Sequence, residues 1–227
     1  MPNMNIIKPM FNDIAHYYDF YNDLLSLFIH RLWKRRLILE LKELKITKLL
    51  DCATGTGDIA RLAYRHGAAD TITGIDFSEN MILLAKEKAL KQKLPIHFTR
   101  ANLEELPFED KTFEVSTISF GIRNVENLNR AIKEMERVSR KALLILEFGQ
   151  PENKIIKKIL FTFLRSLVKV ASQFARNKAA YQYLVDSSEQ FPSGKKFLAI
   201  LKTQTEFNKI YYKKMMFGFV YLYIAKY

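Results

Sequence analysis

The polar residues with the most suggestive spacing follow a short apolar run near residue 50. The segment D-C-A-T-G-T-G-D spans Asp51 to Asp58 and includes Gly55 and Gly57. Glycines at these positions let the backbone turn tightly and approach a ligand, and a helix that starts there offers free N–H groups. G-T-G-D-I-A also fits the dinucleotide pattern G-x-G-x-x-G/A, and a turn that binds nothing can look the same. By itself, the segment predicts only a candidate nucleotide-binding turn.

A carboxylate and an amide stand at the ends of the next two apolar runs. Asp76 comes 19 residues after Gly57, the spacing at which an acid accepts hydrogen bonds from the ribose hydroxyls of an adenosine. The alternative interpretation is that Asp76 supplies a negative charge to the start of the following helix. Asn102 and Leu103 are candidates for framing a planar adenine, although an Asn in a loop is usually a turn residue.

A further group of polar residues lies in the segment I-S-F-G-I-R-N-V. Ser119, Arg123 and Asn124 follow a predicted strand, where the reacting end of a ligand would lie if the strands are parallel. An Arg beside a Gly at the end of a strand is most often a surface cation. Its position, rather than its type, therefore makes Arg123 a candidate.

Short apolar runs that alternate with helical patterns position these residues. We predict strands at 48–53, 71–76, 96–101, 115–120 and 142–148, and a terminal antiparallel hairpin of 209–216 and 219–226. Residues 10–44 and the connections read as helical, with Ser78 as an N-cap. The alternation is typical of an α/β fold with a doubly wound, mostly parallel seven-stranded sheet and helices on both faces. In such a sheet, ligands bind outside the carboxyl ends of the strands.

No internal repeat or Gly/Ser linker divides the chain of 227 residues. We therefore expect a single domain over 1–227, made of a helical cap (1–45), a cofactor-binding core (46–150), a basic helix with a substrate-side insertion (151–208) and the terminal hairpin (209–227). The single cysteine, Cys52, excludes a disulfide scaffold and a cysteine zinc site and fits a reducing cytoplasm. We expect no metal, no secretory signal and no membrane span.

The formal charge of +12 is concentrated in the last third of the chain. Residues 151–227 contain 14 Lys+Arg and 4 Asp+Glu, a net of +10, which leaves +2 for residues 1–150. Residues 154–178 contain seven Lys/Arg and no acid, and at 100° per residue the apolar positions from Ile156 to Phe174 share one face. Two interpretations stay open: a core-facing helix with a solvated basic face, and an interfacial helix that lies on an anionic membrane.

Taken together, these segments resemble the class I S-adenosylmethionine-dependent methyltransferases, and more narrowly the family that methylates the ring of demethylmenaquinol or of a ubiquinol precursor. The segments of the resemblance follow the family's order over about residues 10–190: Y-D-F-Y-N-D-L-L-S (18–26), I-H-R-L-W-K-R (29–35), D-x-A-x-G-T-G-D (51–58), G-I-D-F-S-E-N-M (74–81), L-P-F-E-D, I-S-F-G-I-R-N-V, L-E-F (146–148) and Y-Q-Y-L-V-D-S (181–187). I-H-R-L-W-K-R and S-F-G-I-R-N-V are the family-specific ones. At 214–219 the chain departs from the family, with K-M-M-F-G-F in place of N-L-T-G-G-I.

The resemblance implies roles for individual residues. The implied cofactor-binding residues are Gly55, Thr56, Gly57, Asp76 (ribose), Asn102 and Leu103 (adenine) and Ser119. Arg123 is the candidate for stabilising a phenolic oxyanion or orienting a water that removes the proton. Asn124 would hold Arg123 in place, and Tyr18 would supply a polar contact to the substrate. On this basis Arg123→Ala is expected to lose most turnover while it retains cofactor binding.

The implied reaction transfers a methyl group from S-adenosyl-L-methionine to a ring carbon of a polyprenyl quinol. Demethylmenaquinol is the expected substrate, with a ubiquinone precursor as a further possibility. The expected location is cytoplasmic and peripheral on the inner face of the membrane, through residues 154–178, with no nucleic-acid partner.

Other functions remain open from the sequence. The charge of +12 admits a methyltransferase that acts on RNA, and the fold admits another small-molecule substrate. The glycine pattern admits an NAD-dependent dehydrogenase, and a lipid-surface protein that lost its chemistry is a third alternative. The quinol ring, the prenyl length and the oligomeric state are also left open.

Overall fold

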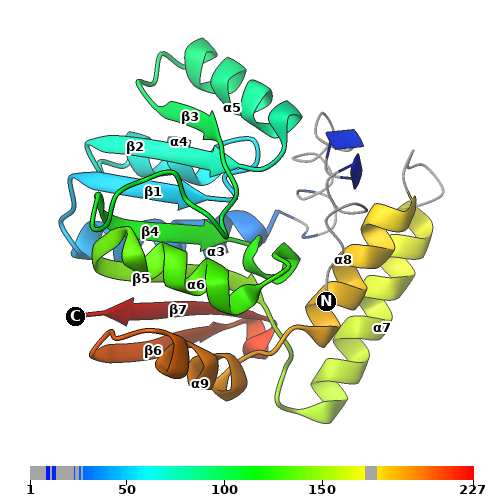
Figure 1. Cartoon of the computed structure of the whole chain (residues 1–227). Helices are drawn as coiled ribbons and strands as arrows, with labels where there is room; N and C mark the ends of the chain where they lie inside the picture. The colour runs from blue at the N-terminus through cyan, green and yellow to red at the C-terminus, as the bar shows by residue number, and fades with distance from the viewer. Residues whose placement is uncertain (1–8, 11, 14–22, 24–25, 27, 172–177) are drawn as a thin grey trace.

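The computed structural model describes residues 9–10, 12–13, 23, 26, 28–171 and 178–227 (Figure 1). Its helices and strands are α3 (His30–Glu43), β1 (Lys48–Cys52), α4 (Asp58–Arg65), β2 (Thr71–Asp76), α5 (Glu79–Lys91), β3 (His97–Arg100), β4 (Phe113–Ser119), η2 (Ile122–Asn124), α6 (Leu128–Arg137), β5 (Ser139–Phe148), α7 (Lys154–Ala171), α8 (Lys178–Gln190), α9 (Lys195–Gln204), β6 (Lys209–Met215), η3 (Met216–Gly218) and β7 (Val220–Lys226). Most of residues 10–29, the first part of the predicted helical region 10–44, lie outside the described residues.

The strands form one sheet of seven in the order β3-β2-β1-β4-β5-β7-β6. β3, β2, β1, β4 and β5 pair in parallel, whereas β7 pairs antiparallel with both β5 and β6. The predicted doubly wound, mostly parallel sheet with a terminal antiparallel hairpin is confirmed. A dinucleotide-binding sheet continues with a parallel strand where β7 lies here, so the dehydrogenase alternative does not fit.

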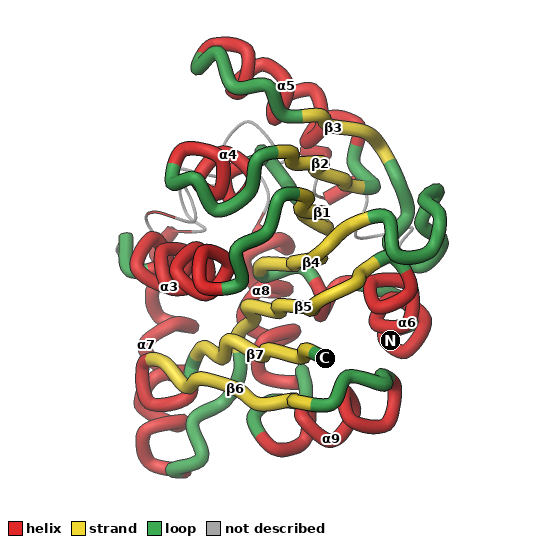
Figure 2. The backbone as a smooth tube through the Cα atoms, turned by 90° about the vertical axis from the view of Figure 1, so that its left-hand side faces the viewer, coloured by secondary structure: helices red, strands yellow, loops and turns green. Residues whose placement is uncertain are grey.

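Helices cover both faces of the sheet, as Figure 2 shows end-on. One core cluster packs α3, α4 and α5 against the sheet, and the other packs α6 and α9 against its opposite face. Strands between such layers are buried on both sides and read as continuous apolar runs. β5 follows this rule in its stretch A-L-L-I-L (142–146). β4 (F-E-V-S-T-I-S) is buried up to Ser119 but includes polar residues, and the buried hydroxyls of Ser116 and Thr117 donate to backbone carbonyls.

The sheet reverses direction of growth at β1, which lies between β2 and β4. This switch point opens a crevice at the carboxyl ends of the strands, the usual ligand site of such sheets. α7 and α8 stand beyond the same ends, at the right of Figure 1. The fold therefore brings the glycine turn, the end of β4 and the basic segment to one side of the molecule.

The predicted basic helix 154–178 differs from the structure in two respects. α7 ends at Ala171, and Lys178 already belongs to α8; residues 172–177, with Phe174 and Arg176, lie outside the described residues. The predicted apolar face is also divided. Leu160 and Leu164 pack against the core, whereas Ile159 and Phe163 are exposed. None of the helices within the described ranges is long and apolar enough to cross a bilayer.

Two glycines with positive φ allow the tight packing of the first βα unit to be tested. Gly57 has φ +79°, and a Cβ there would lie 2.8 Å from Cζ of the buried Phe98; Gly67 has φ +60° with open space around it. We expect Gly67→Ala to lower the free energy of unfolding by about 1–2 kcal/mol through backbone strain alone. Gly57→Ala should cost about 1–3 kcal/mol more because Phe98 must also move. Urea denaturation of both variants measures the difference, and equal losses would contradict this packing.

Candidate functional site

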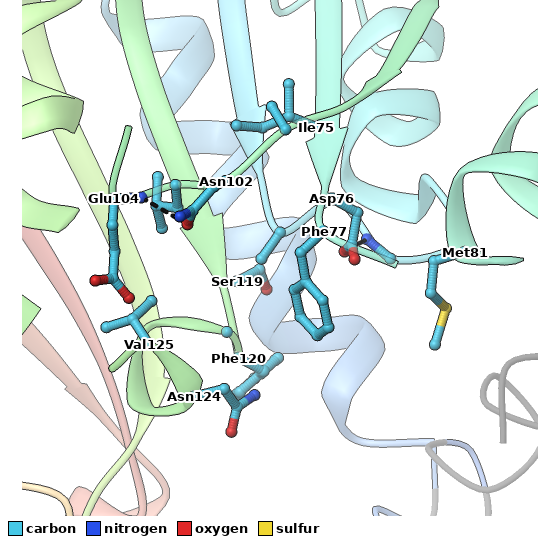
Figure 3. A pocket seen from close by; sticks show the side chains of 15 residues that line it. Ile75, Asp76, Phe77, Met81, Asn102, Glu104, Ser119, Phe120, Asn124 and Val125 are labelled. Carbon is cyan, nitrogen blue, oxygen red and sulfur yellow. Dashed lines mark hydrogen bonds between the residues drawn. The ribbon is translucent and has the colours of Figure 1, made fainter. Parts of the chain in front are cut away.

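A cleft opens at the carboxyl ends of β1, β2 and β4 (Figure 3). Its empty volume, counted out to open solvent, is about 690 Å³. It is lined by Ala53, Gly55, Ile75, Asp76, Phe77, Met81, Ala101, Asn102, Leu103, Glu104, Ser119, Phe120, Gly121, Asn124 and Val125. The structure thus brings together six of the predicted site residues, namely Gly55, Asp76, Asn102, Leu103, Ser119 and Asn124.

Asp76 is held by backbone donors at the end of β2. The Gly55 N–H donates to Oδ2 over 2.9 Å and the Ser78 N–H donates to Oδ1 over 2.9 Å. Each carboxylate oxygen keeps a further lone pair for a ligand hydroxyl. Burial raises the pKa of Asp76 to about 6 in spite of these hydrogen bonds. Ser78 also caps α5, since its hydroxyl accepts from the Met81 N–H, as predicted.

The glycine turn gathers three carboxyl groups, and only one of them faces a buried cation. Asp58 forms an ion pair with Lys34 of α3, which lowers the pKa of Asp58 although burial opposes it. Asp51 accepts a hydrogen bond from the Thr54 hydroxyl, but burial raises the pKa of Asp51 to about 8. Of these three carboxyl groups, that of Asp76 is the one that lines the cleft.

Two of the predicted turn residues lie outside the lining of the cleft. Thr56 is buried in the turn. Gly57 precedes α4 as its N-cap with a left-handed backbone conformation. Gly55 is the member of the turn that borders the cleft. A cofactor contact by Thr56 or Gly57 remains a prediction.

The side of the cleft formed by residues 101–104 is partly apolar. The Asn102 Oδ1 atom accepts a hydrogen bond from the Glu104 N–H over 3.0 Å, drawn as a dashed line in Figure 3. Its amide NH₂ group is then the part that can donate to a ligand. Leu103 lines the cleft beside it, and Phe77 and Met81 add apolar surface from the start of α5. A flat heteroaromatic ring fits this combination of one polar edge and apolar faces.

The hydroxyl of Ser119 has no hydrogen-bond partner among the described residues, although its Oγ atom is buried. An unsatisfied buried hydroxyl costs about 1–3 kcal/mol, so it is a feature that a bound polar ligand would explain. Figure 3 shows Asp76 and Ser119 on either side of the Phe77 ring. The acceptors of Asp76, the amide of Asn102 and the hydroxyl of Ser119 together fit a nucleoside with free ribose hydroxyls.

Arg123 lies behind the cleft and does not line it. Its side chain is 4% exposed, and Nη1 donates to Oε1 of the fully buried Glu147 over 2.8 Å and to the Phe120 carbonyl over 2.6 Å. Its Nε donates to the Ser187 hydroxyl of α8 over 3.3 Å. Burial raises the pKa of Glu147, and the charge of Arg123 opposes that rise. The guanidinium therefore joins η2, β5 and α8.

Asn124 lines the cleft next to this ion pair. Its Oδ1 accepts a hydrogen bond from the hydroxyl of Tyr183 over 3.1 Å. Because the oxygen is occupied by Tyr183, the amide NH₂ group is the part left for a ligand. Burial raises the pKa of Tyr183, so the phenol keeps the proton that it donates.

Three residues of this arrangement received no role from the sequence: Lys34, Glu147 and Tyr183. Each lies in a segment that carried the resemblance, I-H-R-L-W-K-R, L-E-F and Y-Q-Y-L-V-D-S. Their partners are distant in the chain, so spacing alone could not pair them. The predicted substrate contact by Tyr18 lies outside the described residues.

The chain is similar to known proteins over nearly its whole length. Residues 2–226 match the model of the ubiE/COQ5 methyltransferase family. The chain is 36% identical over 225 residues to a ubiquinone/menaquinone biosynthesis C-methyltransferase UbiE from Bdellovibrio bacteriovorus, covering 98% of this chain and 96% of that protein. It is 37% identical over 232 residues to the UbiE of Rickettsia typhi, covering 97% and 92%.

The fold also matches a solved structure. Magnesium protoporphyrin IX methyltransferase from Synechocystis, crystallised with bound SAH, superimposes with a TM-score of 0.68 and 14% identity over 99% of both chains. At this identity the likeness concerns the fold alone. The family model and the near-complete coverage of the curated relatives are stronger, and the chain belongs to the ubiE/COQ5 methyltransferase family.

Proposed function

We propose that this protein transfers a methyl group from S-adenosylmethionine to a ring carbon of a polyprenyl quinol, with demethylmenaquinol as the substrate. The observation that carries the proposal is family membership over residues 2–226, and it is supported by a cleft at the strand ends that Asp76, Asn102 and Ser119 line. The named relatives are C-methyltransferases of ubiquinone and menaquinone biosynthesis, so the proposal includes a benzoquinol precursor as a second substrate.

S-adenosylmethionine supplies an electrophilic methyl group. In the proposal, the Asp76 carboxylate accepts hydrogen bonds from the ribose hydroxyls, Asn102 and Leu103 hold the adenine, and Ser119 donates from the opposite wall. The glycine turn contributes close backbone approach at Gly55. Asn124 lines the same cleft, on η2, where the quinol ring would meet the bound cofactor.

The quinol ring must lose a phenolic proton before its carbon attacks, because a phenol with a pKa of about 10 is a poor nucleophile at neutral pH. The Asn124 amide is placed to donate a hydrogen bond to the resulting oxyanion. Arg123 adds positive charge behind Asn124, but Glu147 neutralises much of it. We therefore propose that Arg123 acts chiefly by positioning η2 and α8. As the new carbon–carbon bond forms, the methyl–sulfur bond breaks, and the ring carbon then loses its proton.

We further propose that the enzyme works at the cytoplasmic face of the membrane, because a polyprenyl quinol is confined to the bilayer. The cations of α7 support this location.

The test of the function is a methyl-transfer assay with reduced demethylmenaquinone, its oxidised form, a reduced benzoquinol precursor and bulk RNA. We expect methylation of the reduced naphthoquinol and none of the oxidised quinone, which has no phenolic proton to lose. Methylation of RNA, or of the oxidised form at the same rate, would contradict the proposal.

Cofactor affinity should depend on pH through Asp76. The pKa of Asp76 is raised to about 6 in the free protein, and only the carboxylate accepts from both ribose hydroxyls. Affinity for S-adenosylhomocysteine should therefore be full above pH 6 and fall by up to about tenfold per pH unit below it. Calorimetry on Asp76→Asn is the control: its binding should be weaker and lack this step. A step that persists in Asp76→Asn would assign it to another group.

Asn124 and Tyr183 should affect turnover rather than cofactor binding. We expect Asn124→Ala to lower kcat by about 10²–10³, and Tyr183→Phe to lower it by about tenfold because the Asn124 amide loses its orientation. The matched control is Tyr212→Phe on β6, which removes a hydroxyl away from the cleft. Single-turnover kinetics with S-adenosylmethionine titrations would separate the two effects. An unchanged kcat in Tyr183→Phe would refute the positioning role.

A further inference from the structure

α7 carries a line of exposed apolar side chains on its outer surface. Ile155, Ile159 and Phe163 are 70%, 65% and 52% exposed. Their spacing of four residues places them on one stripe of the helix. Large apolar side chains that are exposed singly need no explanation, but an aligned group marks an interaction surface.

The inner surface of α7 already has its partners. Phe161 and Val168 are 2% and 4% exposed within the core cluster, and Leu160 and Leu164 pack against that cluster. At 100° per residue, Phe161 and Val168 lie well over a quarter turn from the line of Ile155 and Ile159. The apolar arc of α7 is therefore wider than the part of it that packs against the protein.

Cations border the apolar stripe. Lys154, Lys158 and Lys169 are exposed on the arc beside it, and α7 contains no Asp or Glu. Arg165, on the same arc, is paired with Glu189 of α8. The outer surface thus has one apolar side and one cationic side, a pattern complementary to acyl chains below anionic headgroups.

A second exposed apolar group lies beside the start of α7, at the tip of the β6–β7 hairpin. Met216 and Phe217 are 40% and 76% exposed and have φ angles of +46° and +56°. A positive φ in large residues is a strained conformation that usually has a functional reason.

Two contacts bring the hairpin close to α7. The ring of Phe219 lies 6.2 Å from that of Phe161 on the inner surface of the helix, and Lys214 pairs over 3.3 Å with Glu152, just before the helix starts.

We propose that the stripe Ile155–Ile159–Phe163 and the tip Met216–Phe217 insert together into the interface of an anionic lipid bilayer, with Lys154, Lys158 and Lys169 on the headgroups. The surface, called here the lipid-docking surface, is joined to the cleft through α8, which packs against α7 and donates from Tyr183 to Asn124. A quinol in the bilayer would then have a short path to the cleft. The choice of a lipid as the partner rests on the proposed quinol substrate. The exposed apolar groups and the charges are observed independently of that substrate.

Insertion can be measured without turnover. Trp33 is the single tryptophan and is 5% exposed, so an indole introduced by Phe163→Trp or Phe217→Trp reports its own surroundings. We expect both variants to be quenched by brominated lipids in vesicles of equal parts phosphatidylcholine and phosphatidylglycerol, while Leu90→Trp on α5, an exposed site elsewhere (78%), is not. Absence of quenching in both would overturn the proposal.

Binding to the same vesicles should weaken at least about tenfold in the double variant Ile159→Glu with Phe163→Glu, and Leu90→Glu should bind as the parent does. Phosphatidylcholine alone or high salt should also weaken binding, because the cations act on anionic headgroups. If the double variant bound vesicles as well as Leu90→Glu does, the proposal would be overturned. It would also be overturned if the double variant bound less because it had dissociated from a dimer, which light scattering without lipid would detect. The double variant should still methylate a water-soluble short-chain quinol. If the parent binds vesicles but methylates no quinol, the proposed function fails and the lipid-docking surface stands.

Discussion

The Arg123–Glu147 ion pair connects three elements of the fold, η2, β5 and α8. Glu147 is fully buried near the end of β5, and Arg123 reaches it from η2 while also bonding to Ser187 of α8. Removing one partner of such a pair leaves a buried charge and typically costs about 3–5 kcal/mol. The pair therefore fixes η2, and with it Asn124, relative to the sheet. The same contacts set the distance between the cofactor end of the cleft and the α7–α8 pair.

The two halves of the site are positioned by different elements of the fold. Asp76 and Gly55 are positioned by the first two strands and the glycine turn, which the ion pair of Lys34 and Asp58 ties to α3. Asn124 is positioned by β4, β5 and α8. The cofactor half belongs to the general methyltransferase fold. The half at η2 and α8 is the part that the proposed quinol chemistry needs, and it adjoins the lipid-docking surface.

The sequence predicted the sheet well, and it predicted residues at the glycine turn and strand ends that the structure places around one cleft, because both depend on local patterns. Their cofactor contacts stay predictions. Apolar runs, glycine spacing and the acid at Asp76 follow each other within 30 residues, and β2 was predicted with its bounds as the structure has them. The burial of Arg123 could not be predicted, since Glu147 and Ser187 lie 24 and 64 residues away. Nor could the orientation of α7. Periodicity says which residues share a helix face, but the contacts with β7 and α8 decide how much of that face is buried.

In the proposed reaction, the quinol ring lies between Asn124 and the cofactor, at the α8 side of the cleft. Photolabelling with a reduced azido-quinol in the presence of S-adenosylhomocysteine tests this location most directly. We expect cross-links in peptides that contain residues 119–125 and 182–188, and weaker labelling in Tyr183→Phe. Cross-links confined to the β6 edge of the sheet or to α9 would contradict it.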